Sequence, residues 1–187
     1  MAEARLAECS TTALVVIDVQ EKMVPAITTR PPDQILGSIE RLIGAARILD
    51  IPVIYTEQNP RGLGPTDARL RPALDGAEGP LVKSTCSCWR DEGFRNALKR
   101  TEREHVILCG LECHVCVAQT ALDLLRVDYL PFVPVDAVGS RTSMDMEAAL
   151  ERLRRAGVQV STTEALIFEL VERCDHPKFR EVLRIIK

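Results

Sequence analysis

The chain has 187 residues, of which 46% are hydrophobic and 27% charged, and its 24 basic and 27 acidic side chains leave a formal net charge of −3. This length and composition predict a single domain, residues 1–187, with a substantial buried core. No cluster of Lys and Arg alternates with aromatic residues, so the charge pattern offers no surface for nucleic acid or an anionic membrane. We therefore expect a small-molecule substrate and neither of those partners.

The start of the chain and its cysteines indicate the compartment. Residues 1–5 lack the apolar core of a secretory signal, and the apolar run 13–17 is too short to span a bilayer. The seven cysteines are an odd number, and without an export signal they are expected to be reduced thiols. The sequence thus predicts a cytoplasmic protein.

Short β-branched runs alternate along the chain with longer segments of helical period. This alternation is typical of α/β proteins with a parallel sheet covered by helices. We predict a single three-layer αβα domain whose mostly parallel, six-stranded sheet has helices on both faces. The predicted strands are, in chain order, residues 13–18, 52–56, 81–83, 105–109, 130–135 and 158–160.

Helical spacing of apolar residues and capping signals predict the helices. Asp33 is a candidate N-cap for the first, Ser161 with Glu164 forms a capping box for the third, and Pro177 begins the last. The predicted helices cover residues 35–49, 118–125, 162–172 and 177–187. Residues 57–80 are irregular and rich in Gly and Pro, and they follow the second strand, where α/β sheets place ligand-binding loops. We expect this segment to form a lid.

The turn at residues 110–120 places Cys116 between a strand and a helix. Backbone N–H groups at such a turn stabilise a thiolate and hold an oxyanion. Asp18 ends the first predicted strand and Lys83 ends the third, and the carboxyl ends of parallel strands meet at one edge of a sheet. A thiol, a carboxylate and an ammonium together allow hydrolysis of an amide or a related acyl group.

Four segments together resemble the isochorismatase-like cysteine hydrolase family, which also contains nicotinamidases and N-carbamoylsarcosine amidases. They are ALVVIDVQ at 13–20, VKS at 82–84, GLECHVCVAQT at 110–120 and DAVGSR at 136–141. The resemblance implies that Asp18 is the acid/base, that Cys116 is the nucleophile and that Lys83 completes the triad. It also implies a cis peptide between Leu111 and Glu112, an oxyanion hole formed by the N–H groups of Glu112 and Cys116, and assembly into a homo-oligomer.

One segment departs from the nicotinamidase pattern, in which an Asp and two His hold a metal after the second strand. Residues 56–66 contain no histidine; the histidines are His105, His114 and His176. We therefore predict no metal and no cofactor. The segment instead resembles the isochorismatase-domain-containing subgroup. True isochorismate hydrolases lack the nucleophilic cysteine, so Cys116 argues against that substrate.

The predicted function is that of a metal-independent cysteine hydrolase that cleaves a small amide, C–N or related acyl substrate through a thioester. Lys83 is expected to lower the pKa of Cys116. Gln20, Gln58 and Trp89 are candidate walls of the substrate pocket, although each could serve structure alone.

Several alternatives stay open at the level of sequence. The chain could be a catalytically silent scaffold of the same fold, or a protein with a structural zinc site at Cys86, Cys88, Cys113 and Cys116. Cys113 is either a resolving thiol or a packing residue. We expect His114 to line the mouth of the site or a subunit contact, and the apolar segment 179–186 is a candidate subunit interface.

Overall fold

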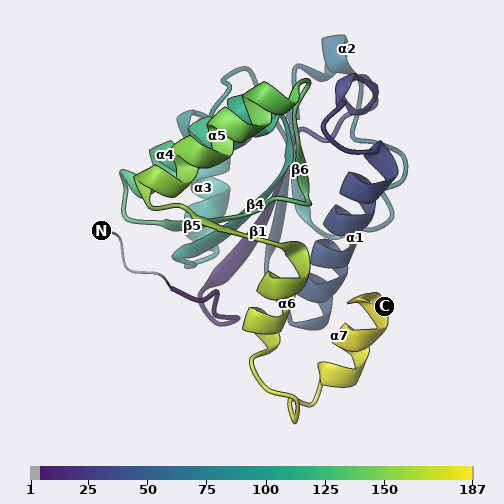
Figure 1. Cartoon of the computed structure of the whole chain (residues 1–187), viewed down its shortest axis with the longest axis vertical. Helices are drawn as coiled ribbons and strands as arrows, with labels where there is room; N and C mark the ends of the chain where they lie inside the picture. Colours follow the sequence, from purple (N-terminus) through teal and green to yellow (C-terminus); the bar gives the residue numbers. More distant parts are fainter. Residues whose placement is uncertain (1–4, 187) are drawn as a thin grey trace.

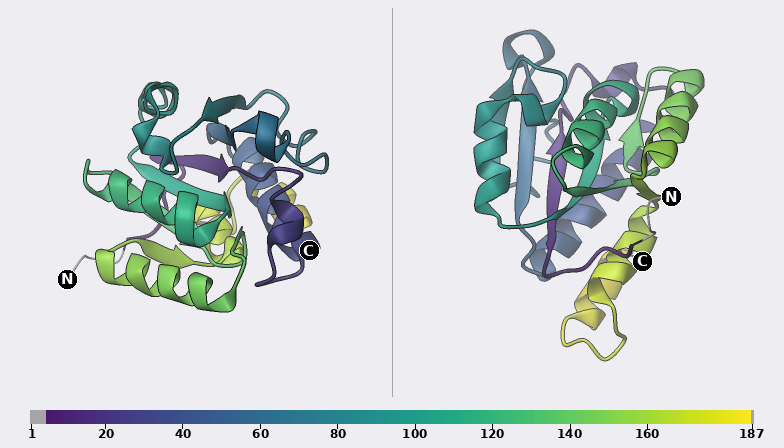
Figure 2. Two further views of the ribbon diagram at one scale, coloured as in Figure 1. Left: turned by 90° about the horizontal axis from the view of Figure 1, so that it is seen from above. Right: turned by 90° about the vertical axis from the view of Figure 1, so that its left-hand side faces the viewer.

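The computed structural model describes residues 5–186 and shows a parallel sheet covered by helices on both faces (Figures 1 and 2). The strands are β1 (Thr12–Ile17), β2 (Val53–Gln58), β3 (Glu78–Lys83), β4 (His105–Leu111), β5 (Leu130–Pro134), β6 (Val138–Gly139) and β7 (Gln159–Ser161). Their order is β3-β2-β1-β4-β5-β7, and β6 pairs with the end of β4. All of these strand pairs are parallel, which confirms the predicted α/β class; the sheet has seven strands rather than six.

The helices form one layer on each face of this sheet (Figure 1). They are α1 (Pro32–Ile48), α2 (Pro60–Leu63), α3 (Glu92–Arg100), α4 (Ala118–Leu125), α5 (Ser143–Ala156), α6 (Thr163–Val171) and α7 (Phe179–Ile186). Strand β1 shows how the two cores arise, because successive side chains of a strand point to opposite faces. Leu14 and Val16 pack with α1, α6 and α7, whereas Ala13, Val15 and Ile17 pack with α3, α4 and α5.

Two helix starts differ from the predicted caps, that of α1 by two residues and that of α6 by one. Pro31 occupies the N-cap position of α1, so Asp33 lies in the first turn, where its negative charge favours the helix dipole. Thr162 caps α6 by accepting a hydrogen bond from the N–H of Ala165. Ser161 therefore ends β7 and does not form the predicted capping box.

Helices α2, α3 and α5 and strand β6 were not predicted from the sequence. Helices α3 and α5 carry many charged side chains, and α3 buries only Phe94, Ala97 and Leu98, so its apolar stripe is short. Strand β6 has two residues, too few for a recognisable alternation. Their formation depends on tertiary contacts. Helices α3 and α5 pack on one face of the sheet, and β6 pairs with the end of β4.

The predicted lid, residues 57–80, is attached to the body of the protein along most of its length. Near its start, Thr66 donates two hydrogen bonds to the buried carboxylate of Glu57, each of 2.7 Å. Further on, Leu70 and Leu74 are buried in the core on the α1 side of the sheet. The segment is thus mainly the crossover from β2 to β3, and only its first part lies at the carboxyl edge.

Helix α7 packs its apolar face within the chain rather than leaving it for a partner. Val182 is fully buried, and Phe179, Ile185 and Ile186 pack against the core formed with α1 and α6. The structure therefore does not favour residues 179–186 as an exposed apolar interface. Within the described residues no helix is both long and apolar enough to cross a membrane.

Candidate active site

Three strands deliver polar residues to the carboxyl edge of the sheet. Asp18 directly follows β1, and Lys83 is the last residue of β3. Strand β4 continues into a π-helical turn, Cys113–Val117, which carries Cys116. Because these strands are parallel and β1 lies between β2 and β4, their ends converge.

Lys83 lies between the other two predicted catalytic residues. Its Nζ donates a hydrogen bond to Oδ2 of Asp18 at 2.6 Å and lies 3.7 Å from Sγ of Cys116. Asp18 is 0% exposed, Lys83 3% and Cys116 5%. The structure thus brings together the three side chains predicted from the sequence, in a site shielded from bulk water.

Further acceptors surround the ammonium of Lys83. Oε1 of Gln58 accepts at 2.6 Å, and the carbonyls of Thr85 and Cys86 accept at 3.1 and 3.3 Å. A buried ammonium needs several acceptors to offset its loss of hydration. These contacts hold Lys83 charged and aimed at Asp18 and Cys116.

The start of the cysteine turn requires glycine. Gly110 has φ of +116°, and a Cβ at this position would lie 2.1 Å from the carbonyl oxygen of Ile17. The backbone of β4 can therefore approach β1 closely beside Asp18 only without a side chain. This contact sets the spacing between the strand that carries Asp18 and the strand that leads to Cys116.

The peptide bond between Leu111 and Glu112 is cis, as the family resemblance predicted. The carbonyl of Glu112 accepts hydrogen bonds from the N–H groups of Val115 and Val117, which closes the turn around Cys116. The side chain of Glu112 pairs with Arg141 at 2.6 Å. Glu112 is therefore fixed on both its backbone and its carboxylate.

The pKa of Cys116 depends on opposing effects of its surroundings. Burial and the negative charge of Asp18 raise the pKa of the Cys116 thiol, and the opposing effect of Lys83 is smaller. Lys83 lowers the pKa of Cys116, as predicted, but burial, which is the largest effect, and the charge of Asp18 outweigh it. Burial alone would lower the pKa of Lys83, but Asp18 and the neighbouring thiols raise it. The resting site therefore holds a neutral thiol and a charged lysine.

Thr56 belongs to this site and was missed as a functional candidate. Its hydroxyl donates a hydrogen bond of 2.7 Å to Oδ1 of Asp18, and it is 1% exposed. The available signal was a hydroxyl residue at the end of a buried strand. Only the pairing of β1 with β2, with Ile17 in register with Thr56, places it beside Asp18.

The three residues predicted to form pocket walls, Gln20, Gln58 and Trp89, each have different surroundings in the structure. Gln20 is fully buried, and its side-chain amide bonds the backbone N–H and carbonyl of Gln58, so it supports β2. Gln58 contacts Lys83, as described above. The ring of Trp89 packs against Tyr129 at 5.5 Å and under the ammonium of Lys99 at 6.0 Å. These contacts fix the ring of Trp89 beside Tyr129 and Lys99, and its role as a pocket wall stays a prediction.

The remaining cysteines and His114 have defined surroundings. Among the described residues, no three His, Cys, Asp or Glu side chains are placed to hold a metal ion, so the four thiols of the zinc hypothesis do not form such a group. Cys86 is exposed, whereas Cys88 and Cys113 are buried, and burial raises the pKa of each of these two to about 12. His114 contacts the hydroxyl of Ser140 at 3.0 Å.

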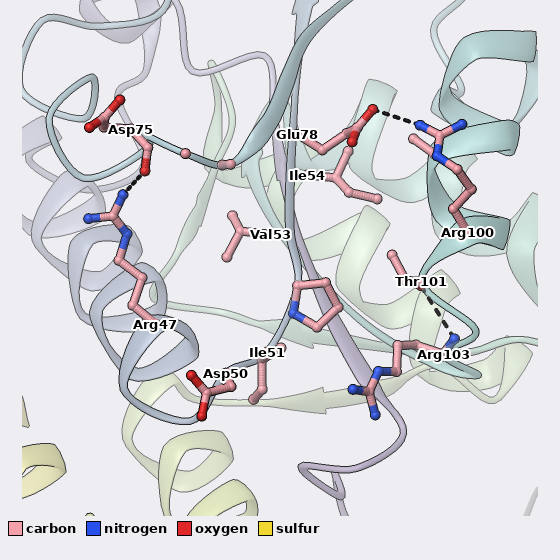
Figure 3. A pocket seen from close by; sticks show the side chains of 14 residues that line it. Arg47, Asp50, Ile51, Val53, Ile54, Asp75, Glu78, Arg100, Thr101 and Arg103 are labelled. Carbon is pink, nitrogen blue, oxygen red and sulfur yellow. Dashed lines mark hydrogen bonds and ion pairs between the residues drawn. The ribbon is translucent and has the colours of Figure 1, made fainter.

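A large cavity of about 620 Å³ lies at the opposite, amino end of the strands (Figure 3). Arg47 hydrogen-bonds to the carbonyl of Asp75, and Arg100 pairs with Glu78 at 2.7 Å. In Figure 3 these charged groups point to neighbours on the rim rather than to a common centre, and Val53 lies between them. The cavity has volume but no converging reactive groups.

Comparison with known proteins identifies the family of this chain. The family model of the isochorismatase domain matches residues 12–165, and the chain belongs to the isochorismatase family. It is 40% identical over 175 residues to isochorismatase domain-containing protein 2A of Mus musculus, which covers 93% of this chain and 82% of that protein. It is also 40% identical over 176 residues to isochorismatase domain-containing protein 2 of Danio rerio, covering 92% and 85%.

Solved structures show the same fold. One described as MAR1 ribonuclease from Caenorhabditis elegans is 41% identical, with a TM-score of 0.88 and coverage of 97% of this chain and 92% of that chain. The YcaC gene product of Escherichia coli, described as an octameric hydrolase of unknown specificity, is 23% identical, with a TM-score of 0.91 and coverage of 99% and 92%.

Proposed function

We propose that this chain is a metal-independent cysteine hydrolase that cleaves a small amide, C–N or related acyl substrate. The observation that carries the proposal is the position of Lys83 Nζ, 2.6 Å from Asp18 and 3.7 Å from Cys116 inside a buried site. A thiol, a general base and a cation in mutual contact are the groups that acyl transfer to sulfur requires.

In the proposed reaction, Asp18 accepts the proton of Cys116 as Sγ attacks the substrate carbonyl carbon. The backbone N–H groups of Glu112 and Cys116 stabilise the oxyanion. The C–N bond then breaks, Asp18 returns the proton to the leaving amine, and the acyl group remains on Sγ as a thioester. Water, deprotonated by Asp18, cleaves the thioester and regenerates the thiol. These steps need neither a metal nor a cofactor.

The raised pKa of Cys116 affects how the first step proceeds. Because the resting thiol is neutral, its ionisation must accompany attack, and Asp18 must be ionised to accept the proton. Lys83 stabilises the anionic form at each stage. General alkylating reagents near neutral pH should therefore modify the exposed thiols Cys86 and Cys174 before Cys116.

The decisive experiment is a hydrolysis screen of small amides, carbamoyl compounds and thioesters on wild type, Cys116→Ala and Cys113→Ala. Cys113 is the matched control, because it is a buried thiol in the same turn but has no contact with Lys83. We expect Cys113→Ala to retain activity and Cys116→Ala to lose it. Intact mass spectrometry of wild type during turnover should show the mass of one acyl group. Full activity of Cys116→Ala would contradict the covalent mechanism.

The name of the C. elegans relative raises RNA hydrolysis as a second activity to test. Two features of this chain favour acyl transfer instead, namely a thiol at the site and a net charge of −3 with no cluster of Lys and Arg that alternates with aromatic residues. RNA cleavage that survived Cys116→Ala would support the second activity. Absence of turnover on every class, together with an unreactive Cys116, would indicate a silent scaffold.

We propose further that the chain is cytoplasmic and forms a homo-oligomer. The assembly follows from the family resemblance, and the octameric state described for the E. coli relative is one possible size. Light scattering coupled to size-exclusion chromatography would give the subunit number. A monomer across micromolar concentrations would contradict the assembly.

A further inference from the structure

The second carboxylate oxygen of Asp18 has its own hydrogen-bond donor. Oδ2 accepts from Lys83, and Oδ1 accepts from the hydroxyl of Thr56 at 2.7 Å. Asp18 and Thr56 are 0% and 1% exposed, so water does not compete for this contact. A buried carboxylate of this kind depends on its protein donors, since an unpaired oxygen would keep the full penalty of desolvation.

The backbone strengthens the same contact. The N–H of Asp18 donates to the carbonyl of Thr56 at 3.2 Å, so Thr56 holds Asp18 through both its main chain and its side chain. Asp18 has φ of +49°, a left-handed conformation that few non-glycine residues adopt. The two bonds to Thr56 together fix the direction in which this carboxylate points.

We propose that Thr56 is a positioning residue that holds the Asp18 carboxylate aimed toward Cys116. The inference rests on the proposed function, because it assigns Thr56 a task only if Asp18 is the base for Cys116. Thr56 itself touches no substrate atom in this assignment and acts through the carboxylate.

The physical reason is the preference of a hydroxyl donor for a charged acceptor. A hydrogen bond to a carboxylate is stronger than one to a neutral acceptor, so loss of the Thr56 hydroxyl would remove a strong contact to Asp18. The titratable groups that face Asp18 are Lys83 on β3, Cys88 on the turn after β3, and Cys116. Sγ of Cys88 lies 3.9 Å from the Thr56 hydroxyl, and its pKa, raised by burial to about 12, keeps it neutral in the acid range.

Two variants separate the hydroxyl from the shape of the side chain. Thr56→Val replaces the hydroxyl by a methyl group of similar size, and Thr56→Ser keeps the hydroxyl. Thr12→Val is the matched control, because Thr12 is a fully buried strand threonine whose hydroxyl bonds the carbonyl of Glu8 at 2.6 Å, at the amino end of β1. Thr12→Val therefore loses a buried hydrogen bond away from Asp18.

The measurement is the rate of Cys116 alkylation by acrylamide at neutral pH, followed at the Cys116 peptide by mass spectrometry. It needs no known substrate, and the exposed thiol of Cys86 provides an internal reference in each sample. In Thr56→Val the rate at Cys116 should fall about tenfold relative to wild type, as expected for loss of one hydrogen bond to a charged group, and the rate at Cys86 should not change.

The outcomes are distinct. Thr56→Ser and Thr12→Val should keep the wild-type rate at Cys116, and an unchanged rate in Thr56→Val would overturn the inference. A loss of equal size in Thr12→Val would also overturn it, because the cause would then be general loosening. Asp18→Asn serves as the separate test of the proposed function: if its rate at Cys116 equals that of wild type, Asp18 is not the base and the proposed function fails, whatever Thr56 does.

Discussion

The two ends of the sheet carry opposite arrangements of charge. At the carboxyl edge, the charges of Asp18 and Lys83 are buried, in contact with each other and next to the thiol of Cys116. At the amino edge, a cavity of about 620 Å³ has its charged groups on the rim, and the Arg100–Glu78 pair is 61% and 49% exposed. The cavity at the amino edge has no cluster of reactive side chains, whereas the side chains of Asp18, Lys83 and Cys116 are almost completely buried.

This difference shows why volume alone does not identify a reactive site. Burying the Asp18–Lys83 pair is costly, because both ions lose hydration, and the fold offsets this cost with donors and acceptors from several strand ends. No such cost arises for an ion pair that remains in water. A buried ion pair beside a thiol is therefore a stronger indication of function than a cavity whose charged groups remain exposed to water.

The largest expected effect is on turnover. Cys116→Ala should lower the rate on any substrate found by at least about a thousandfold, because the covalent step disappears. Arg47→Gln, in the cavity at the amino edge, should leave the rate within about twofold, because it touches none of the reacting groups. Steady-state kinetics of both variants checks the comparison. Loss of turnover in Arg47→Gln with an intact fold would assign the cavity to catalysis.

The next largest effect is on stability. Lys83→Met should lower the free energy of unfolding by about 3–5 kcal/mol, because Asp18 would keep a buried charge without its cation. Urea denaturation monitored by circular dichroism measures this change. The double variant Asp18→Asn, Lys83→Met should recover part of the loss, since it removes both charges. A loss in Lys83→Met below about 1 kcal/mol would show that the pair is energetically like one at the surface.

The buried thiols predict a dependence of stability on alkaline pH. Cys88, Cys109, Cys113 and Cys116 all have pKa values raised above the model-peptide value of 9.0. A raised pKa in the fold means that their contribution is fully present below about pH 9 and is lost as the pH rises toward the folded values. Each thiol should reduce the free energy of unfolding by about 1.4 kcal/mol per pH unit above that point.

The pH effect can be assigned to particular thiols by removing one at a time. Cys109→Ala should reduce the slope of unfolding free energy against pH by the contribution of one ionising thiol, because Cys109 is fully buried in β4. Cys174→Ala removes an exposed thiol and should leave the slope unchanged. Denaturant titrations at several pH values between about 9.5 and 11 measure both slopes. Equal slopes in wild type and Cys109→Ala would contradict the expectation.

The smallest effect belongs to the rim of the cavity. Arg100→Gln removes an ion pair whose members are both largely exposed, so the unfolding free energy should change by no more than about 1 kcal/mol. The same urea titration used for Lys83→Met detects the contrast. A loss as large as that of Lys83→Met would erase the distinction drawn between the two ends of the sheet.

The meeting of Asp18, Lys83 and Cys116 could be predicted from the sequence because each of these residues sits where a local pattern ends. Asp18 and Lys83 close apolar runs, and Cys116 follows one across a tight turn. Trp89 could not be placed in this way, since its direction depends on how α3 packs beside α4 and Tyr129. The caps at Asp33 and Ser161 were wrong by one or two positions, because neighbouring polar residues and prolines offer competing starts.

The sequence by itself determined the α/β class, the strand ends that carry Asp18 and Lys83, and the turn that carries Cys116, because periodicity and turn residues are local properties of the chain. Only the tertiary structure decided that β2 lies beside β1, which gives Asp18 its contact with Thr56. It also decided that Cys116 rests as a neutral thiol, since burial and the Asp18 charge outweigh Lys83. Desolvation and charge contacts depend on which distant segments become neighbours, and no local pattern contains that information.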